Sequence, residues 1–281
     1  MRLLSGEDLP RVLVVGGGEM GSAVAHRLVR AGMRVFVADL ESPICVRRGV
    51  CFAAAPPEGR KEIEGVTGVR SPSVEDALEV AGKGMVPVVV LRQGERDYRE
   101  LAALLAVEVV VDARMLKRNE GISKDVAPLV VGLGPGFRAS RDVHAVVETN
   151  RGHNLGRVIY DGEPEPDTGV PAEIDGYGQE RVIRAPDDGV FRAGAQIGQS
   201  VCRDETLGVV GQRTAVKASI NGLLRGLVAD GTLVRRGQKI GDVDPRDKAI
   251  DPFTISDKGR AVAGGVLEAI MRWWVRSDAR V

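Results

Sequence analysis

Short apolar runs and amphipathic stretches alternate along the first half of the chain. Apolar runs predict strands at residues 12–15, 35–38, 87–91, 107–112 and 129–133. A further strand is expected near residues 62–69. Amphipathic stretches predict helices after residue 18, after Ser73 and over residues 95–106. The acidic residues Glu75 and Asp76, which follow Ser73, are typical of the first turn of a helix. Because strands alternate with helices, we expect an α/β domain with a parallel, doubly wound sheet.

An internal repeat follows over residues 181–244. Glycines and valines recur at one constant offset, in the pairs Gly189/Gly222, Arg192/Arg225, Gly198/Gly231, Val201/Val234 and Gly208/Gly241. Glycine turns between short β-branched runs predict two interlocked β-hairpin units. The pattern resembles the barrel-sandwich fold of biotinyl and lipoyl carrier domains. Those carriers attach their cofactor to a lysine in the central hairpin, but no lysine lies between Arg203 and Val216, so a carrier function is not expected.

The first apolar run leads into a glycine-rich turn. Gly16, Gly18 and Gly21 give the spacing G-x-G-x-x-G, and the second run ends at Asp39. Gly16 allows a tight turn, Gly18 lets a pyrophosphate approach the backbone, and Gly21 lets the helix pack closely. The Asp39 carboxylate could accept hydrogen bonds from the ribose diol of NAD, and its charge would repel the 2′-phosphate of NADP. The motif predicts NAD binding on a Rossmann-like domain, and the alternative is a domain that keeps the turn without a nucleotide.

The patterns together predict four segments. Residues 1–150 form the Rossmann-like domain, 151–180 a junction loop, 181–246 the barrel-sandwich-like β domain, and 247–281 a C-terminal segment that packs back. Within the last segment, residues 256–275 carry apolar positions at helical spacing and predict a helix with one buried face. The expected fold class is therefore α/β with a β-rich second domain and a C-terminal helix.

Composition narrows the function classes. The 281 residues include 39 basic and 39 acidic side chains, so no overall field favours nucleic acid or an anionic membrane. Three cysteines without a C-x-x-C pair argue against a disulfide framework, and no apolar run reaches membrane-spanning length. We expect a cytoplasmic, soluble, globular protein. The sequence does not define the oligomeric state, and a homo-oligomer is one of the alternatives.

A polar stretch after the last apolar run is the main candidate for chemistry. Glu148, Asn150, Arg151 and His153 lie within six residues, interrupted by glycine. Arginine suits an anionic ligand, and an imidazole exchanges protons near neutral pH. We interpret Asn150 and Arg151 as cofactor-binding and Glu148 and His153 as acid–base candidates. The alternative is an interdomain network of salt bridges and hydrogen bonds.

Two further groups are weaker candidates. Gly134 and Gly136 follow an apolar strand, and their N–H groups form either an anion-binding nest or a simple turn leaving the sheet. Cys45 and Cys51 flank two arginines, which favour the reactive thiolate form, although both cysteines also fit as small buried hydrophobes. No metal site is predicted, because the acidic residues 242–247 are more typical of a capped turn.

Several segments together resemble one protein family. They are residues 43–52, 111–117, 132–137, 147–157, 167–171, 184–186, 224–226, 241–246, 256–258 and 265–269. In this order they resemble the YqeB-type accessory proteins of selenium-dependent molybdenum hydroxylases. The most specific part is Glu-Thr-Asn-Arg-Gly-His at residues 148–153. Where the family is expected to have asparagine before Thr-Gly, this chain has Asp167.

The resemblance implies a role in maturing a molybdenum hydroxylase, which would be the partner together with its maturation machinery. The ligand would then be a nucleotide or the molybdenum cofactor, including its nucleotide form. It implies no catalytic residue, so whether the chain is an enzyme stays open. The alternatives are a NAD-dependent oxidoreductase of unknown substrate and a non-catalytic module that docks on a partner.

Overall fold

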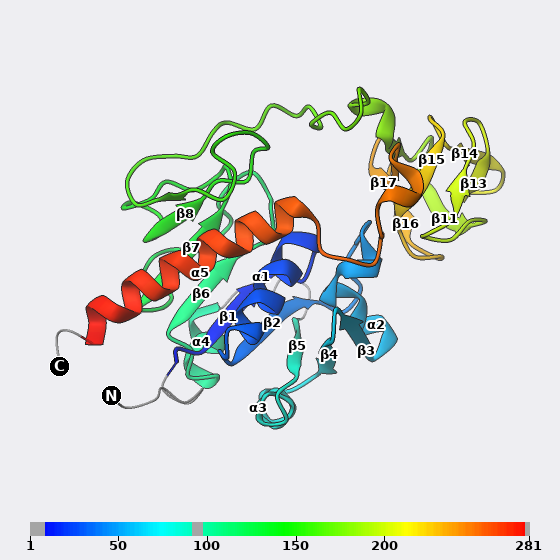
Figure 1. The fold of residues 1–281 in the computed structure, drawn as a ribbon. Coiled ribbons are helices and arrows are strands. Elements are labelled where there is room, and N and C mark those ends of the chain that lie inside the picture. The colour runs from blue at the N-terminus through cyan, green and yellow to red at the C-terminus, as the bar shows by residue number, and fades with distance from the viewer. Residues whose placement is uncertain (1–8, 92–97, 279–281) are drawn as a thin grey trace. The chain divides into compact units, whose positions relative to one another are not determined.

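The computed structural model describes residues 9–91 and 98–278 (Figure 1). Contacts divide the chain into two units. The sheet unit comprises Met1–Pro43, Phe52–Asp167 and Ile255–Val281, and the repeat unit comprises Ile44–Cys51 and Thr168–Thr254. The limits of these units differ from the predicted boundaries at 150, 180 and 246. Those boundaries stay predictions, because contact-based units need not fold independently.

The sheet unit is built on one sheet of nine strands. Its strands are β1 (Val12–Val15), β2 (Val35–Leu40), β3 (Arg60–Ile63), β4 (Val66–Ser71), β5 (Val86–Leu91), β6 (Val109–Asp112), β7 (Leu129–Leu133), β8 (Ala145–Val147) and β9 (Val158–Ile159). Their order is β3-β4-β5-β2-β1-β6-β7-β8-β9. The strands from β4 to β8 in this order pair in parallel, and the edge strands β3 and β9 are antiparallel. The expected α/β class is confirmed, with a mixed rather than purely parallel sheet.

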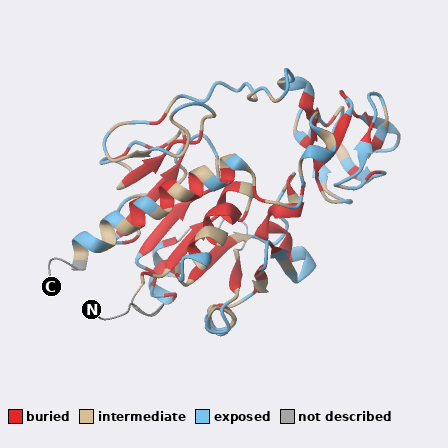
Figure 2. Ribbon diagram, in the orientation of Figure 1, coloured by how far each residue is buried: buried red, intermediate tan, exposed pale blue. Residues whose placement is uncertain are grey.

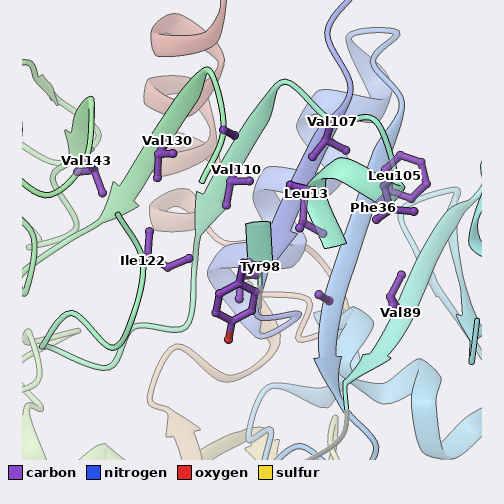
Figure 3. Packing of buried hydrophobic residues seen from close by; sticks show 14 of the residues in the cluster. Leu13, Phe36, Val89, Tyr98, Leu105, Val107, Val110, Ile122, Val130 and Val143 are labelled. Carbon is purple, nitrogen blue, oxygen red and sulfur yellow. The ribbon is translucent and has the colours of Figure 1, made fainter. Parts of the chain in front are cut away.

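Helices cover both faces of this sheet. They are α1 (Glu19–Arg30), α2 (Ala55–Glu58), α3 (Val74–Gly82), α4 (Tyr98–Leu104) and α5 (Asp257–Asp278), and short 3₁₀ turns lie at Arg48–Val50, Phe52–Ala54, Gln179–Arg181 and Asp247–Ala249. One core cluster contains Leu13 of β1, Phe36 of β2 and Tyr98 of α4, which Figure 3 shows. The same cluster includes Ala77 of α3. Because side chains alternate along a strand, Val12 and Val14 face the other side, where α1 and α5 lie side by side (Figure 1). The central strands β1, β6 and β7 are buried along their whole length (Figure 2).

Most predicted elements of this unit are confirmed, with two differences. The Ser73 side chain caps α3 by accepting a hydrogen bond from Asp76 N–H at 3.1 Å, as the sequence indicates. A single strand over residues 62–69 is wrong, because Glu64 and Gly65 both have positive φ and turn the chain into the β3–β4 hairpin. The helix predicted over 95–106 is observed as α4, and residues 95–97 lie outside the described part.

The repeat unit contains two four-stranded antiparallel sheets. Its strands are β10 (Val182–Arg184), β11 (Gly189–Ala193), β12 (Ser200–Val201), β13 (Thr206–Val210), β14 (Thr214–Lys217), β15 (Gly222–Leu227), β16 (Leu233–Val234) and β17 (Lys239–Asp244). The sheets have the orders β10-β17-β15-β12 and β14-β13-β11-β16. Exchanging β10–β13 with β14–β17 converts one sheet order into the other. The repeat seen in the sequence is therefore also a repeat of the fold, in which each sheet takes strands from both copies.

A buried charge network lies within the repeat unit. Asp242 and Asp244 are 5% and 0% exposed, and Arg181 and Arg225 are almost as deeply buried. Arg225 Nη1 lies 3.8 Å from Asp242 and 3.5 Å from Asp244, and Arg246 Nη2 lies 2.8 Å from Asp244. These carboxylates are thus paired with arginines. In the described residues, no group of three or more His, Cys, Asp or Glu side chains gathers as a metal ion would need.

Within residues 9–91 and 98–278, no helix combines the length and the apolar character needed to cross a bilayer.

Candidate functional site

The carboxyl ends of the parallel strands share one edge of the sheet. Val15 at the end of β1 pairs in register with Ala38 of β2 and Asp112 of β6. The chain order changes direction at β1, with β2, β5 and β4 on one side and β6, β7 and β8 on the other. In open α/β sheets, ligands bind outside the carboxyl ends of the strands at this kind of switch point.

The glycine turn occupies this switch point. Gly16 has φ +97°, and its N–H donates to Ala38 O at 2.8 Å. Gly18 is the N-cap of α1 with an ordinary φ of −67°, and apart from its chain neighbours no atom of the described residues lies within 4 Å of where its Cβ would be. A Cβ on Gly21 would collide with the Gly16 carbonyl oxygen. Gly16 and Gly21 are therefore needed by the turn itself, whereas the space above Gly18 is open.

Asp39 at the end of β2 reaches back to the turn. Its Oδ2 accepts a hydrogen bond from Gly17 N–H at 2.6 Å, and its Oδ1 accepts one from Leu40 N–H at 2.8 Å. Burial raises the pKa of Asp39, and these two hydrogen bonds lower it in part. A carboxylate has about four lone-pair positions, so this one can still accept hydrogen bonds from a ligand hydroxyl.

Glu148 anchors the loop between β8 and β9. Its carboxylate accepts hydrogen bonds from the N–H groups of Thr149 at 2.7 Å, Asn150 at 2.6 Å and Glu165 at 2.7 Å, and the residue is only 2% exposed. With these three backbone donors, the carboxylate holds the loop in shape. This arrangement favours the hydrogen-bond network over a role for Glu148 as a general base.

The other polar residues of this loop are also engaged. Both terminal nitrogens of Arg151 donate to Asp257, at 2.7 and 2.9 Å. Asn150 and Asn154 donate to Glu165 at 2.6 and 3.0 Å, and these hydrogen bonds lower the pKa of Glu165. His153 lies exposed in the turn. The structure thus brings Glu148 and Asn150 together but does not place the His153 ring with them.

Gly134 and Gly136 form a tight turn at the end of β7. Gly134 N–H donates to Val147 O at 2.9 Å, and the Thr149 side chain fills the space beside Gly134. A Cβ on Gly136 would lie 2.6 Å from Arg118 N. The Gly134 N–H is committed to the backbone and the turn is tightly packed, which favours the simple turn over an anion-binding nest.

Lys258 is the residue that pattern analysis of the sequence missed. It is half-buried in the first turn of α5. Burial, followed by the positive charges of Lys117 and Arg151, lowers the pKa of Lys258, and the carboxylates of Glu19 and Glu148 offset this in part. The available signal was its place in the Ser-Asp-Lys segment that carries part of the family resemblance.

Cys45 and Cys51 belong to the repeat unit. Cys51 is fully buried and Cys45 is half-buried. The guanidinium of Arg48 donates to Leu227 O at 2.9 Å, so one of the neighbouring cations serves the packing of this segment. The burial of Cys51 favours the interpretation as a small hydrophobe.

Comparison with known proteins gives one close relative. No family model matches the chain. The uncharacterized protein YqeB from Escherichia coli (strain K12) is 42% identical over 267 residues, which is 95% of this chain and 48% of that protein. The chain is of the YqeB type. It spans about half the length of this curated relative.

Similar solved structures are distant. An aspartoacylase family protein from Mesorhizobium loti is 10% identical with a TM-score of 0.29, covering 84% of this chain and 85% of that one. The E. coli tRNA N6-threonylcarbamoyladenosine dehydratase TcdA, in complex with AMP, is 14% identical with a TM-score of 0.33, covering 96% and 88%. At such TM-scores neither likeness carries an argument about this YqeB-type chain.

Proposed function

We propose that the sheet unit binds a nucleotide containing a phosphate bridge, with NAD as the first candidate, at the turn between β1 and α1. The observation that carries this proposal is the space above Gly18, which no other described residue fills, at the N-terminus of a 12-residue helix and at the switch point of the sheet. The partial order β5-β2-β1-β6-β7-β8 supports a Rossmann-like interpretation, because it follows the strand order of doubly wound dinucleotide-binding domains.

The start of α1 supplies the chemistry that such a ligand needs. The first N–H groups of a helix have no intrahelical acceptor, and the helix dipole favours an anion there. Glu19 in this first turn would oppose a phosphate. Its Oε1, however, accepts a hydrogen bond from the Ser256 hydroxyl at 3.0 Å, which directs this oxygen toward α5.

The wider role that we propose for this YqeB-type protein is that of an accessory or maturation factor for a selenium-dependent molybdenum hydroxylase. This role rests on the resemblance in the motifs. The molybdenum cofactor in its nucleotide form shares the phosphate bridge and suits the same glycine turn. A separate anion site at Gly134 and Arg151 is less well supported, because Gly134 N–H and the Arg151 guanidinium already have partners.

For the repeat unit we infer a barrel-sandwich fold of the carrier type that carries no cofactor. The turn between β13 and β14 consists of Gly211, Gln212 and Arg213, so the amine that carriers use is missing there. A non-catalytic role in docking on a partner protein does not require a lysine in that turn. The NAD-dependent oxidoreductase is not favoured, because Glu148 is committed to three backbone N–H groups and His153 lies exposed.

Binding calorimetry with NAD, NADH, FAD and a molybdopterin nucleotide tests the proposed ligand. We expect one of them to bind and Gly18→Glu to weaken it at least tenfold, because the new carboxylate enters the phosphate position. The φ of Gly18 and the open space make this substitution compatible with the fold. Gly82→Glu at the exposed end of α3, also in open space, is the matched control and should bind like wild type.

The outcome also distinguishes the ligands. Binding of NAD that Gly18→Glu abolishes supports the dinucleotide site, and binding of the molybdopterin nucleotide alone, with the same sensitivity, supports the accessory role. If none of the four ligands binds to the folded protein, the proposed nucleotide site is wrong. Equal binding by wild type and Gly18→Glu places the ligand elsewhere and overturns the proposal in the same way.

Asp39→Asn should reduce the affinity for NAD about tenfold, because a neutral amide forms weaker hydrogen bonds with the ribose diol. The asparagine oxygen can still accept the Gly17 N–H, so the turn is retained. The same change should narrow the preference for NAD over NADP, since the charge that repels the 2′-phosphate is gone. Titration of both nucleotides into both proteins is the measurement. Unchanged affinities would mean that Asp39 only supports the turn.

A further inference from the structure

The start of α5 is fixed from two directions. The Ser256 hydroxyl caps the helix by accepting the Gly259 N–H at 3.1 Å, and it donates to Glu19 at the start of α1 at 3.0 Å. The next residue, Asp257, is held by both terminal nitrogens of Arg151 from the β8–β9 loop. Lys258 follows directly, so its backbone is positioned by contacts to both neighbouring elements of the site.

Lys258 is surrounded by charges that do not pair with it. Among the residues that the structure describes, no hydrogen bond or ion pair holds its ammonium group, and the interactions with Glu19, Glu148, Lys117 and Arg151 act at longer range. The Glu148 carboxylate is occupied by three backbone N–H groups. A half-buried amine without a close counter-ion weakens the fold, and residues of this kind gather at functional sites.

Lys117 brings a second amine toward the same region. It adopts φ +64°, an uncommon conformation for a residue other than glycine, and its backbone packs tightly on Gly136. Its Nζ lies 3.4 Å from Asp167, a pair that is partly exposed on both sides. An exposed pair of this kind contributes little to stability, so an incoming anion can compete with Asp167 for Lys117.

We propose that Lys258, assisted by Lys117, contacts the phosphate groups of the ligand bound at the glycine turn, and that Lys258 is an unusually reactive amine. This inference rests on the proposed function and adds the residues that neutralise the ligand. Glu19 links the two features, since it begins α1 directly after Gly18 and also contributes to the electrostatic environment of Lys258. The phosphate would supply a close counter-ion for Lys258, which none of the described side chains provides.

The substitution Lys258→Met separates this role from a structural one. Methionine keeps the apolar stem and removes the half-buried charge, so the midpoint of urea unfolding should stay equal or rise. Affinity for the nucleotide should fall about tenfold. Lys83→Met at the C-cap of α3, where the lysine is exposed and paired with Glu79, is the matched control and should change neither affinity nor labelling at Lys258.

Pyridoxal 5′-phosphate is the direct probe, because it combines an aldehyde with a phosphate. A deprotonated amine attacks the aldehyde carbon, a C–N bond forms and water leaves. Borohydride then delivers hydride to the imine carbon and fixes the label as a secondary amine. At neutral pH we expect peptide mass spectrometry to find Lys258 labelled at least tenfold faster than Lys83. Saturating inorganic pyrophosphate or NAD should suppress this labelling.

The results separate this inference from the proposed function. If NAD binds and is sensitive to Gly18→Glu, but Lys258 labels no faster than Lys83 and Lys258→Met keeps full affinity, the inference is wrong and the proposed function stands. If pyrophosphate protects a fast-labelling Lys258 while none of the four nucleotides binds, the anion contact stands and the nucleotide site falls. Labelling that neither anion suppresses overturns the phosphate contact.

Discussion

Gly21→Ala is expected to destabilise the protein by roughly 3 kcal/mol, although alanine is the better helix former. The added Cβ would collide with the carbonyl oxygen of Gly16 and would lie 3.1 Å from the Ala113 side chain. Both neighbours are held in place, because Gly16 N–H bonds Ala38 O and Ala113 N–H bonds Val15 O. Relief of the clash therefore requires α1 to shift away from the ends of strands β1 and β6. Urea unfolding measures the loss of stability.

Gly264→Ala is the matched control, because this glycine also lies inside a helix but has open space around its missing Cβ. There the substitution should stabilise the protein by about 0.5–1 kcal/mol through helix propensity alone. Gly21→Ala should in addition weaken nucleotide binding, since a shifted α1 moves the N–H groups that face the phosphates. Equal stability of the Gly21 and Gly264 variants would show that the turn adapts and that Gly21 is not a packing requirement.

The glycine turn could be predicted from sequence because its constraints are local. A positive φ at Gly16 and a close contact at Gly21 are set by residues within one β-α unit, and the motif spacing encodes them. The Ser73 cap is local in the same sense. The repeat was visible because each copy uses glycine at equivalent turns, such as Gly189 and Gly222 with φ of +144° and +150°.

The remainder of the site depends on contacts between distant segments. Glu148 looks like a catalytic acid in the sequence, but the bond from Glu165 N–H that completes its three donors comes from 17 residues further along. Apart from the Ser-Asp-Lys segment, Lys258 carries no local signal, since its environment is made by α1, the β8–β9 loop and the loop of Lys117. The β3–β4 turn is hard to predict for a different reason, because residue types alone do not reveal the positive φ that Glu64 adopts before Gly65.

Asp244→Asn is expected to destabilise the repeat unit by about 3 kcal/mol, because it removes one charge from a buried network and leaves the arginines behind. Asp244 accepts hydrogen bonds from Arg246 at 2.8 and 2.9 Å, and buried Arg225 lies 3.5 Å away. Asp204→Asn, whose carboxylate is exposed and 4.0 Å from Arg203, is the matched control and should change stability little.

The pH dependence identifies charge as the cause of this loss. Burial raises the pKa of Asp244, but the hydrogen bonds and charge of Arg246, with Arg225, outweigh burial and leave the pKa below its ordinary value. The unfolded chain therefore takes up a proton at this carboxyl before the folded one does. Its contribution to stability is complete above the unfolded pKa of about 3.9 and disappears as the pH falls through the lower folded value. The stability difference between wild type and Asp244→Asn should accordingly be constant near neutral pH and shrink below about pH 4. A difference that stays constant through this acid range would instead assign the loss to altered packing around an uncharged amide.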